Sequence, residues 1–172
     1  VYPVYGRPAD LIELNLKDFD PDLPNMRLVG RVSGQKMLPY YTREEIEKAP
    51  FAAPVLLWGD SAVDIHIMQI QGSAVAKLDD GSSVRIGYAD NNGRRFRGIG
   101  SILLAKGLLK PGKADMISIK KWLNDNPAEA QKLMRENERY IFHRIIEGKG
   151  PVGAFGVPLT AGRSLAVERR YV

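Results

Sequence analysis

The apolar segments of this 172-residue chain are short, and turn-forming residues end them. Gly59-Asp60 follows the apolar run Val55–Trp58, and Asp79-Asp80-Gly81 separates Ala74–Leu78 from Ser83–Tyr88. Asp-Gly supplies the positive φ that a tight hairpin turn needs. No apolar run approaches the ~18 residues that a membrane-spanning helix requires. The chain is therefore predicted to fold from short strands, with no transmembrane segment.

Helical patterns accompany these strands. Ile99, Ile102 and Leu103 have i, i+3, i+4 spacing, and Asn126-Pro127 fits a helix cap followed by a first-turn proline. Thr42-Arg43-Glu44-Glu45 fits a capping box. We therefore predict an α+β fold, a small antiparallel β-barrel with three or four short helices, forming a single domain over residues 1–172. The predicted strands are Val1–Tyr5, Leu11–Leu16, Arg27–Val32, Val63–Gln71, Ala74–Leu78, Ser83–Tyr88, Tyr140–Ile146, Gly156–Leu159 and Ser164–Val167.

Composition excludes several kinds of chemistry. The chain has no cysteine, so disulfides, iron–sulfur clusters, cysteine zinc sites and thiol nucleophiles are absent. Its two histidines, His66 and His143, are too few for a histidine-rich metal centre. Either could titrate near neutrality, although two ordinary polar positions are the simpler interpretation. We expect neither a metal nor a cofactor. The net charge of +5 favours an anionic partner or simply aids solubility.

The segment Val63–Gln71 gives the clearest indication of a binding site. With the period of a strand, Val63, Ile65 and Ile67 share one face, and Gln69 and Gln71 continue it up to Gly72-Ser73. Either a bulge changes the phase or the strand end points two amides into a pocket.

Two further motifs are weaker. Gly148-Lys149-Gly150-Pro151-Val152-Gly153 has the spacing of a dinucleotide-binding loop, but no helical pattern follows it, so a glycine-rich connection is expected. Arg94-Arg95-Phe96-Arg97 combines cations with a ring, as single-stranded nucleic-acid binders do. A solvated turn is the favoured interpretation of this cluster, and we expect no nucleic-acid partner.

Several segments, in order, resemble the membrane-bound lytic murein transglycosylase A family over roughly Tyr2 to Tyr171. Ala74, Phe96, Gly98, Ala161 and Glu168 depart from the usual family residues, which affects loop details. The resemblance is carried by Gln69-Ile70-Gln71-Gly72-Ser73, Val84–Ala89 with Asn92-Gly93, Arg97–Gly100, Ser118–Leu123, Asn137 with Tyr140–Phe142, Gly153–Thr160 and Gly162–Val167.

The resemblance implies a bacterial cell-wall enzyme. The family cleaves the β-1,4 bond between N-acetylmuramic acid and N-acetylglucosamine without water, leaving 1,6-anhydromuramyl ends. One carboxyl group can act as acid and then base, since the nucleophile belongs to the substrate. The chain resembles the inserted, substrate-cleft domain of this two-domain enzyme. The catalytic aspartate of the family follows the region matching Gly162–Tyr171, so we expect it beyond Val172 and expect no catalytic residue in this chain.

The resemblance also implies a location and partners. The expected partners are peptidoglycan glycan strands and the catalytic domain of the same polypeptide. The expected location is the periplasm of a Gram-negative bacterium, with an outer-membrane anchor on the full-length protein as a further expectation. The alternative is a freestanding module that binds polysaccharide or single-stranded nucleic acid. The expected substrate-binding residues are Gln69, Gln71, Gly72, Ser73, Tyr88, Arg163 and Ser164.

Overall fold

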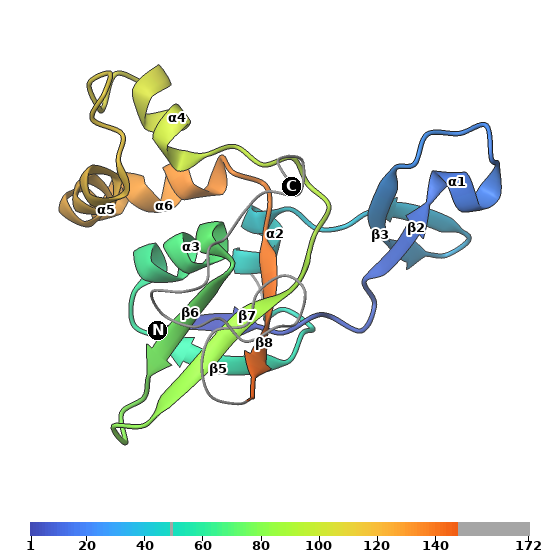
Figure 1. Ribbon diagram of the computed structural model, residues 1–172, viewed down its shortest axis with the longest axis horizontal. Coiled ribbons are helices and arrows are strands. Elements are labelled where there is room, and N and C mark those ends of the chain that lie inside the picture. The colour runs from blue at the N-terminus through green and yellow to red at the C-terminus, as the bar shows by residue number, and fades with distance from the viewer. Residues whose placement is uncertain (49, 148–172) are drawn as a thin grey trace, which may run out of the picture.

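The computed structural model describes residues 1–48 and 50–147, which form an α+β fold (Figure 1). The strands are β1 (Tyr2–Tyr5), β2 (Ile12–Asn15), β3 (Arg27–Ser33), β4 (Lys36–Pro39), β5 (Val55–Gly59), β6 (Ser73–Lys77), β7 (Ser83–Asn91) and β8 (Ile141–Ile146). The helices are α1 (Leu16–Phe19), α2 (Arg43–Lys48), α3 (Ala62–Gln71), α4 (Ile99–Ala105), α5 (Met116–Asp125) and α6 (Pro127–Arg135). The α+β class is confirmed, with six helices in the described part rather than three or four.

The strands form three antiparallel sheets. Strand β1 pairs with β5, β3 lies between β2 and β4, and β7 lies between β6 and β8. An isolated bridge between Gly6 and His143 links the β1–β5 pair to β8. None of the three sheets closes on itself within residues 1–147, so the predicted barrel has no support in that part of the chain. The Gly148–Gly153 motif and the last two predicted strands lie outside the described residues.

The segment predicted as the strand Val63–Gln71 is the helix α3, and that prediction was wrong. Its ends carry helix caps: the Ser61 side chain accepts a hydrogen bond from the Asp64 amide, and Gly72 ends the helix with a φ of 81°. Val63 and Ile67, at i and i+4, pack into the core formed with α4, α5 and α6. Val63 and Ile67 fit both the two-residue period of a strand and the 3.6-residue period of a helix, and burial against α4, α5 and α6 selects the helix.

Other local predictions are confirmed. The Thr42 amide and hydroxyl both donate to the Glu45 carboxylate, which forms the predicted capping box before α2. The predicted hairpin is β6–β7, and Gly81 has a φ of 81° in its turn. Helix α6 begins at Pro127, with Asn126 at its cap position. The strand β4 was not predicted.

The core has a helical part and an aromatic part, beside a smaller cluster under β6 and β7. Helices α3 to α6 share the first, whose most buried members include Leu103 and Leu123. Tyr40, Tyr140 and Phe142 lie at the centre of the second, between α2 and β8. Strands β2 and β3 and helix α1 project to one side of the molecule (Figure 1), and Val29 of β3 packs against the aromatic part.

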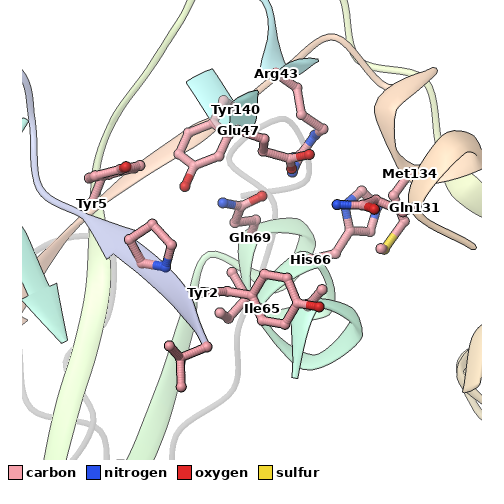
Figure 2. Close-up of a pocket in the computed structure, with 13 residues that line it drawn as sticks. Tyr2, Tyr5, Arg43, Glu47, Ile65, His66, Gln69, Gln131, Met134 and Tyr140 are labelled. Carbon is pink, nitrogen blue, oxygen red and sulfur yellow. The ribbon is translucent and has the colours of Figure 1, made fainter. Parts of the chain in front are cut away.

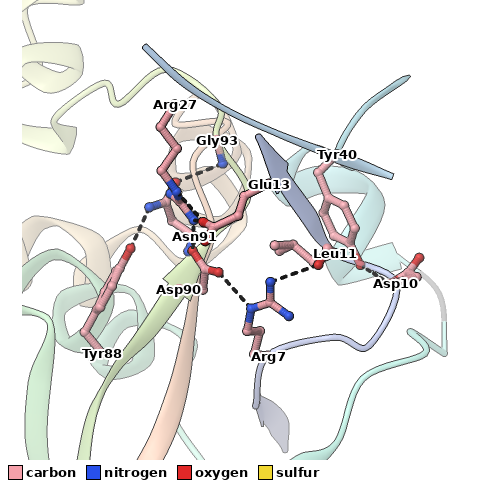
Figure 3. Close-up of polar contacts among 10 residues, drawn as sticks. All are labelled: Arg7, Asp10, Leu11, Glu13, Arg27, Tyr40, Tyr88, Asp90, Asn91 and Gly93. Atoms are coloured by element: carbon pink, nitrogen blue, oxygen red, sulfur yellow. Dashed lines mark hydrogen bonds and ion pairs between the residues drawn. The ribbon is translucent and has the colours of Figure 1, made fainter. Parts of the chain in front are cut away.

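One carboxylate connects this outlying sheet to the body. Asp90, at the end of β7, accepts from Arg7 Nε at 2.9 Å and from Arg27 Nη2 at 2.6 Å (Figure 3). Arg27 belongs to β3 and also pairs with Glu13 of β2. Arg7 Nη2 donates to the Leu11 carbonyl at 2.9 Å. Asp90 therefore holds the chain entering β2 and the strand β3 against β7.

Candidate functional site

The amides of Gln69 and Gln71, near the C-terminal end of α3, do not share one face as predicted. Gln69 is 4% exposed and points inward, whereas Gln71 lies on the surface. Residues two apart on a helix point in nearly opposite directions, so the prediction that both amides share one face was wrong. Gly72 reverses the chain, with its N–H bonded to the Met68 carbonyl, and Ser73 begins β6 as an exposed residue.

Gln69 adjoins a buried arginine and a buried tyrosine (Figure 2). Arg43 donates from Nε to the Asn137 carbonyl at 3.0 Å and from Nη2 to the Arg139 carbonyl at 2.7 Å. Its Nη1 pairs with Glu47 at 3.1 Å, and its guanidinium carbon lies 5.2 Å from the ring centroid of Tyr140. Burial lowers the pKa of Arg43, which Glu47 opposes. Arg43 thereby connects α2 to the chain entering β8.

A cavity of about 280 Å³ lies beside this cluster (Figure 2). Both ring nitrogens of His66 and Oε1 of Gln69 are buried in its wall without a hydrogen-bond partner among the described residues. Burial, assisted by the charge of Arg43, lowers the pKa of His66 to about 3, so its imidazole is neutral near pH 7. The cavity is lined by Val1, Tyr2, Pro3, Tyr5, Arg43, Glu47, Ala62, Ile65, His66, Gln69, Gln131, Met134 and Tyr140.

A second hollow, of about 230 Å³, lies on the other side of Gln69. Gln69 and Ile70 line it from α3, and Phe96 lines it from the loop that joins β7 to α4. The Phe96 ring is 47% exposed. Arg43, Asn137, Arg139 and Ile141 complete its wall. The site thus combines a buried amide, arginines and an exposed ring, which are groups that contact sugars and other polar ligands.

Two buried asparagines hold the backbone around this second hollow. Asn92 is 1% exposed, and its Nδ2 donates to the carbonyls of Tyr41 and Glu138, both at 2.8 Å. Its Oδ1 accepts from the Tyr140 amide at 2.9 Å. Asn137 is 2% exposed, and its Oδ1 accepts from the Arg97 amide at 3.1 Å. The loop carrying Phe96 is therefore fixed at both ends by side-chain amides.

Four of the predicted site residues lie on the surface near the start of β6. Ser73 pairs with Gly87, which precedes Tyr88 on β7, so Gln71, Gly72, Ser73 and Tyr88 gather at one end of the hairpin. Tyr88 is 45% exposed, and its hydroxyl accepts from Asn91 Nδ2 at 2.7 Å. Gln69 is buried and lines the two hollows instead. The other predicted site residues, Arg163 and Ser164, lie outside the described residues.

The two histidines occupy buried positions rather than the ordinary polar positions favoured for them. Burial lowers the pKa of His143 to about 4, and neither of its ring nitrogens has a partner in the described part of the chain. Within residues 1–48 and 50–147, no three His, Cys, Asp or Glu side chains gather where they could hold a metal ion. In the same residues, no helix is long and apolar enough to cross a membrane.

Sequence reasoning missed the residues that frame the site. Arg43 was seen only as part of a capping box, and nothing local marks it as buried. Asn92, Asn137 and Tyr140 belong to the segments that carried the family resemblance, which was the available indication of their importance. Phe96 belongs to the Arg94–Arg97 cluster, whose pattern indicates a solvated turn or a nucleic-acid contact and not a wall of the second hollow.

The fold and the site define an α+β domain with a polar surface site rimmed by an aromatic ring. The family described as the MltA specific insert domain matches residues 1–144. The chain belongs to this family.

Curated and solved relatives agree with this assignment. The chain is 31% identical over 120 residues to membrane-bound lytic murein transglycosylase A of Escherichia coli strain K12, covering 69% of this chain and 33% of that protein. The chain thus spans about a third of the length of the curated relatives it matches.

Two crystal structures show the same fold. A membrane-bound lytic murein transglycosylase from Agrobacterium tumefaciens has a TM-score of 0.82 and 33% identity, covering 98% of this chain and 47% of that one. MltA from Neisseria gonorrhoeae has a TM-score of 0.79 and 30% identity, covering 92% of this chain and 48% of that one.

Replacing His66 with Phe is expected to stabilise the protein. A buried polar group without a partner costs about 1–3 kcal/mol, and the adjacent cavity can accept the larger ring. Because the folded-state pKa of His66 is about 3 and its ordinary value is 6.5, wild-type stability falls as pH drops from 6.5 towards 3. The gain in Tm of His66→Phe should therefore widen over that range in thermal denaturation.

His66→Gln is the control, because it keeps a polar group in the same place. A lower Tm for His66→Phe at both pH 7 and pH 5 would show that the imidazole has a stabilising partner, such as ordered water.

Proposed function

We propose that this chain is the substrate-cleft domain of a peptidoglycan lytic transglycosylase. The full-length enzyme would cleave the β-1,4 bond between N-acetylmuramic acid and N-acetylglucosamine and leave 1,6-anhydromuramyl ends. The family match over residues 1–144 and the relatives named lytic murein transglycosylases support this proposal. Those relatives are also named membrane-bound, which supports a place in the Gram-negative cell envelope, in the periplasm or at the outer membrane.

The surface at the end of α3 is the observation that carries the proposal. Gln71 and Ser73 offer an amide and a hydroxyl there, on either side of the backbone turn at Gly72. On the same helix as Gln71, the buried Gln69 lines one hollow together with the exposed Phe96. Sugar hydroxyls pair with amides and hydroxyls, while the apolar CH face of a sugar packs on a ring. A neutral glycan chain fits this combination.

The site residues supply binding rather than acid catalysis. A glycosidic acid needs a carboxyl group with a raised pKa beside the scissile bond. Glu47, the carboxylate in the cavity wall, is held in ion pairs with Arg43 at 3.1 Å and with Arg135 at 3.0 Å, so it serves the structure of the domain. We therefore place the catalytic aspartate in the remainder of the polypeptide and expect the isolated chain to release no anhydromuropeptides. No cofactor is required.

The test uses Gln71→Ala and Ser73→Ala in the full-length enzyme acting on murein glycan strands. Each variant removes one hydrogen bond of about 0.5–1.5 kcal/mol, so KM should rise about 2- to 10-fold with the fold intact. Both side chains are exposed, so their loss leaves the core unchanged. Ser83→Ala, an exposed serine at the far end of the same hairpin, is the matched control. Kinetics unchanged in both site variants would overturn this assignment of the cleft.

The alternative function is a freestanding module that binds polysaccharide or single-stranded nucleic acid. The net charge of +5 and the exposed Arg95-Phe96-Arg97 run favour it. Binding of an oligonucleotide with a steep salt dependence, together with no binding of glycan, would select this alternative.

A further inference from the structure

The loop between β7 and α4 displays two arginines around an exposed ring. Arg95 is exposed and makes no hydrogen bond or ion pair with any residue that the structure describes. Arg97 is 56% exposed in its side chain and lies 3.7 Å from Glu136, a carboxylate that Lys106 already contacts at 2.9 Å. Phe96 stands between the two arginines. Two cations are thus presented to solvent without a strong internal partner.

The fold holds this loop rigidly although its three side chains are displayed. The Arg94 Nε donates to the Tyr40 carbonyl at 2.7 Å, and the Arg94 carbonyl accepts from Arg139 Nε at 2.7 Å. The buried Asn137 accepts from the Arg97 amide. The backbone on both sides of Phe96 is therefore anchored, while the Arg95 and Phe96 side chains contribute little to burial. A rigid backbone with displayed side chains lowers the entropy cost of binding a ligand.

Phe96 separates two hollows of different character. The smaller, of about 230 Å³, contains the buried Gln69, whose Oε1 has no partner among the described residues. The larger, of about 640 Å³, is lined by Arg95, Arg97 and Ser101 together with Gly98, Ile102 and Ala105. No Asp or Glu is among the described residues that line either hollow. The two arginines of the smaller hollow, Arg43 and Arg139, already donate to backbone carbonyls, so that hollow suits a neutral polar group. The larger hollow suits an anion, because Arg95 and Arg97 line it.

We propose that Arg95 and Arg97 bind carboxylate groups of the murein strand, while Phe96 packs on the adjacent sugar. The inference rests on the proposed function, because it assigns part of the same substrate to this surface. Where a muramyl unit carries no stem peptide, its lactyl group ends in a free carboxylate, which N-acetylglucosamine lacks. Guanidinium groups form charge-assisted hydrogen bonds with carboxylates, in paired geometry where both oxygens are reachable. The loop would then distinguish muramyl units from neutral units of the same chain.

The test compares two tetrasaccharides of equal length on the full-length protein. One alternates N-acetylglucosamine with N-acetylmuramic acid and carries lactyl carboxylates, and the other is neutral chitotetraose. Arg95→Gln/Arg97→Gln should weaken binding of the anionic sugar about tenfold at low salt and change chitotetraose binding less than twofold. Raising salt should reduce the wild-type preference for the anionic sugar.

Lys110→Gln/Lys113→Gln is the control, because it removes the same charge from two exposed positions in a different loop. An equal loss in that control, or an equal loss for both sugars in the arginine variant, would overturn the inference. Stronger binding of an oligonucleotide than of either sugar would assign the patch to nucleic acid instead. If wild type binds neither tetrasaccharide, the proposed function itself fails, which is a separate outcome.

Discussion

Replacing Arg43 with Met is expected to lower the free energy of unfolding by about 3 kcal/mol. Arg43 is 2% exposed and donates to the backbone carbonyls of Asn137 and Arg139. Met fills a similar volume but donates nothing, so both carbonyls lose their partner, at about 1–3 kcal/mol each. Glu47 keeps its contact with Arg135, which limits the further loss from the unpaired carboxylate.

The measurement is denaturant unfolding at pH 7, followed by the tyrosine signal. Arg95→Met is the matched control, because Arg95 is exposed and has no partner among the described residues. Its effect should stay within about 0.5 kcal/mol. Equal stability of Arg43→Met and wild type would show that the two carbonyls find other donors, such as water entering from the neighbouring cavity.

Arg43 also controls the candidate site. It lines both hollows beside Gln69, and it fixes the chain segment that leads into β8. A variant that still folds should therefore bind glycan more weakly, because Gln69 and the Asn137 carbonyl lose their fixed spacing. This effect is separate from stability, since it would persist at temperatures far below the Tm.

Local sequence patterns predicted much of the fold. Three features depend on only a few adjacent residues, and all three form: the capping box at Thr42, the Asp-Gly turn between β6 and β7, and the start of helix α6 at Asn126-Pro127. The strand predicted over Val63–Gln71 failed because its Val and Ile residues satisfy both a period of 2 and a period of 3.6. Only packing against α4 to α6, which is not visible locally, decides between them.

The candidate site was less predictable than the fold. Gln71 and Ser73 are on the surface as expected, but Gln69 is buried because α3 is a helix. The burial of Arg43 depends on carbonyls 94 and 96 residues away in sequence, so no short motif could indicate it. The family resemblance did point to Asn137 and Tyr140, because it compares the whole chain rather than one segment.

Removing the carboxylate of Asp90 is expected to detach the outlying sheet without unfolding the body. Asp90 has an 8% exposed side chain and bridges Arg7 and Arg27, whose side chains are about 40% exposed. Hydrogen bonds to charged groups contribute about 1.5–3 kcal/mol, and the exposed arginines recover part of this by hydration. Asp90→Ala should therefore cost about 2 kcal/mol. Hydrogen exchange should rise in β2 to β4 and stay slow in β6 to β8.

The contact of Asp90 with Arg7 and Arg27 should also change how the Tm depends on pH in acid. Burial alone would raise the pKa of Asp90, but hydrogen bonds from Arg27 and Arg7 outweigh it and hold the pKa below its ordinary value of 3.8. The ionised form is thus favoured in the folded state, so its contribution is present above pH 3.8 and is lost as pH falls through the folded-state pKa. Wild type should therefore lose Tm more steeply than Asp90→Ala below pH 3.8, although both proteins lose some Tm as other carboxylates become protonated.

Asp64→Ala is the control. It removes an exposed partner of Lys120 and should keep the wild-type dependence of Tm on pH. Parallel acid curves for wild type and Asp90→Ala would show that the two arginines are held by other contacts. The outlying sheet would then owe its position to the covalent chain and to the packing of Val29 against the aromatic core instead of to this charge.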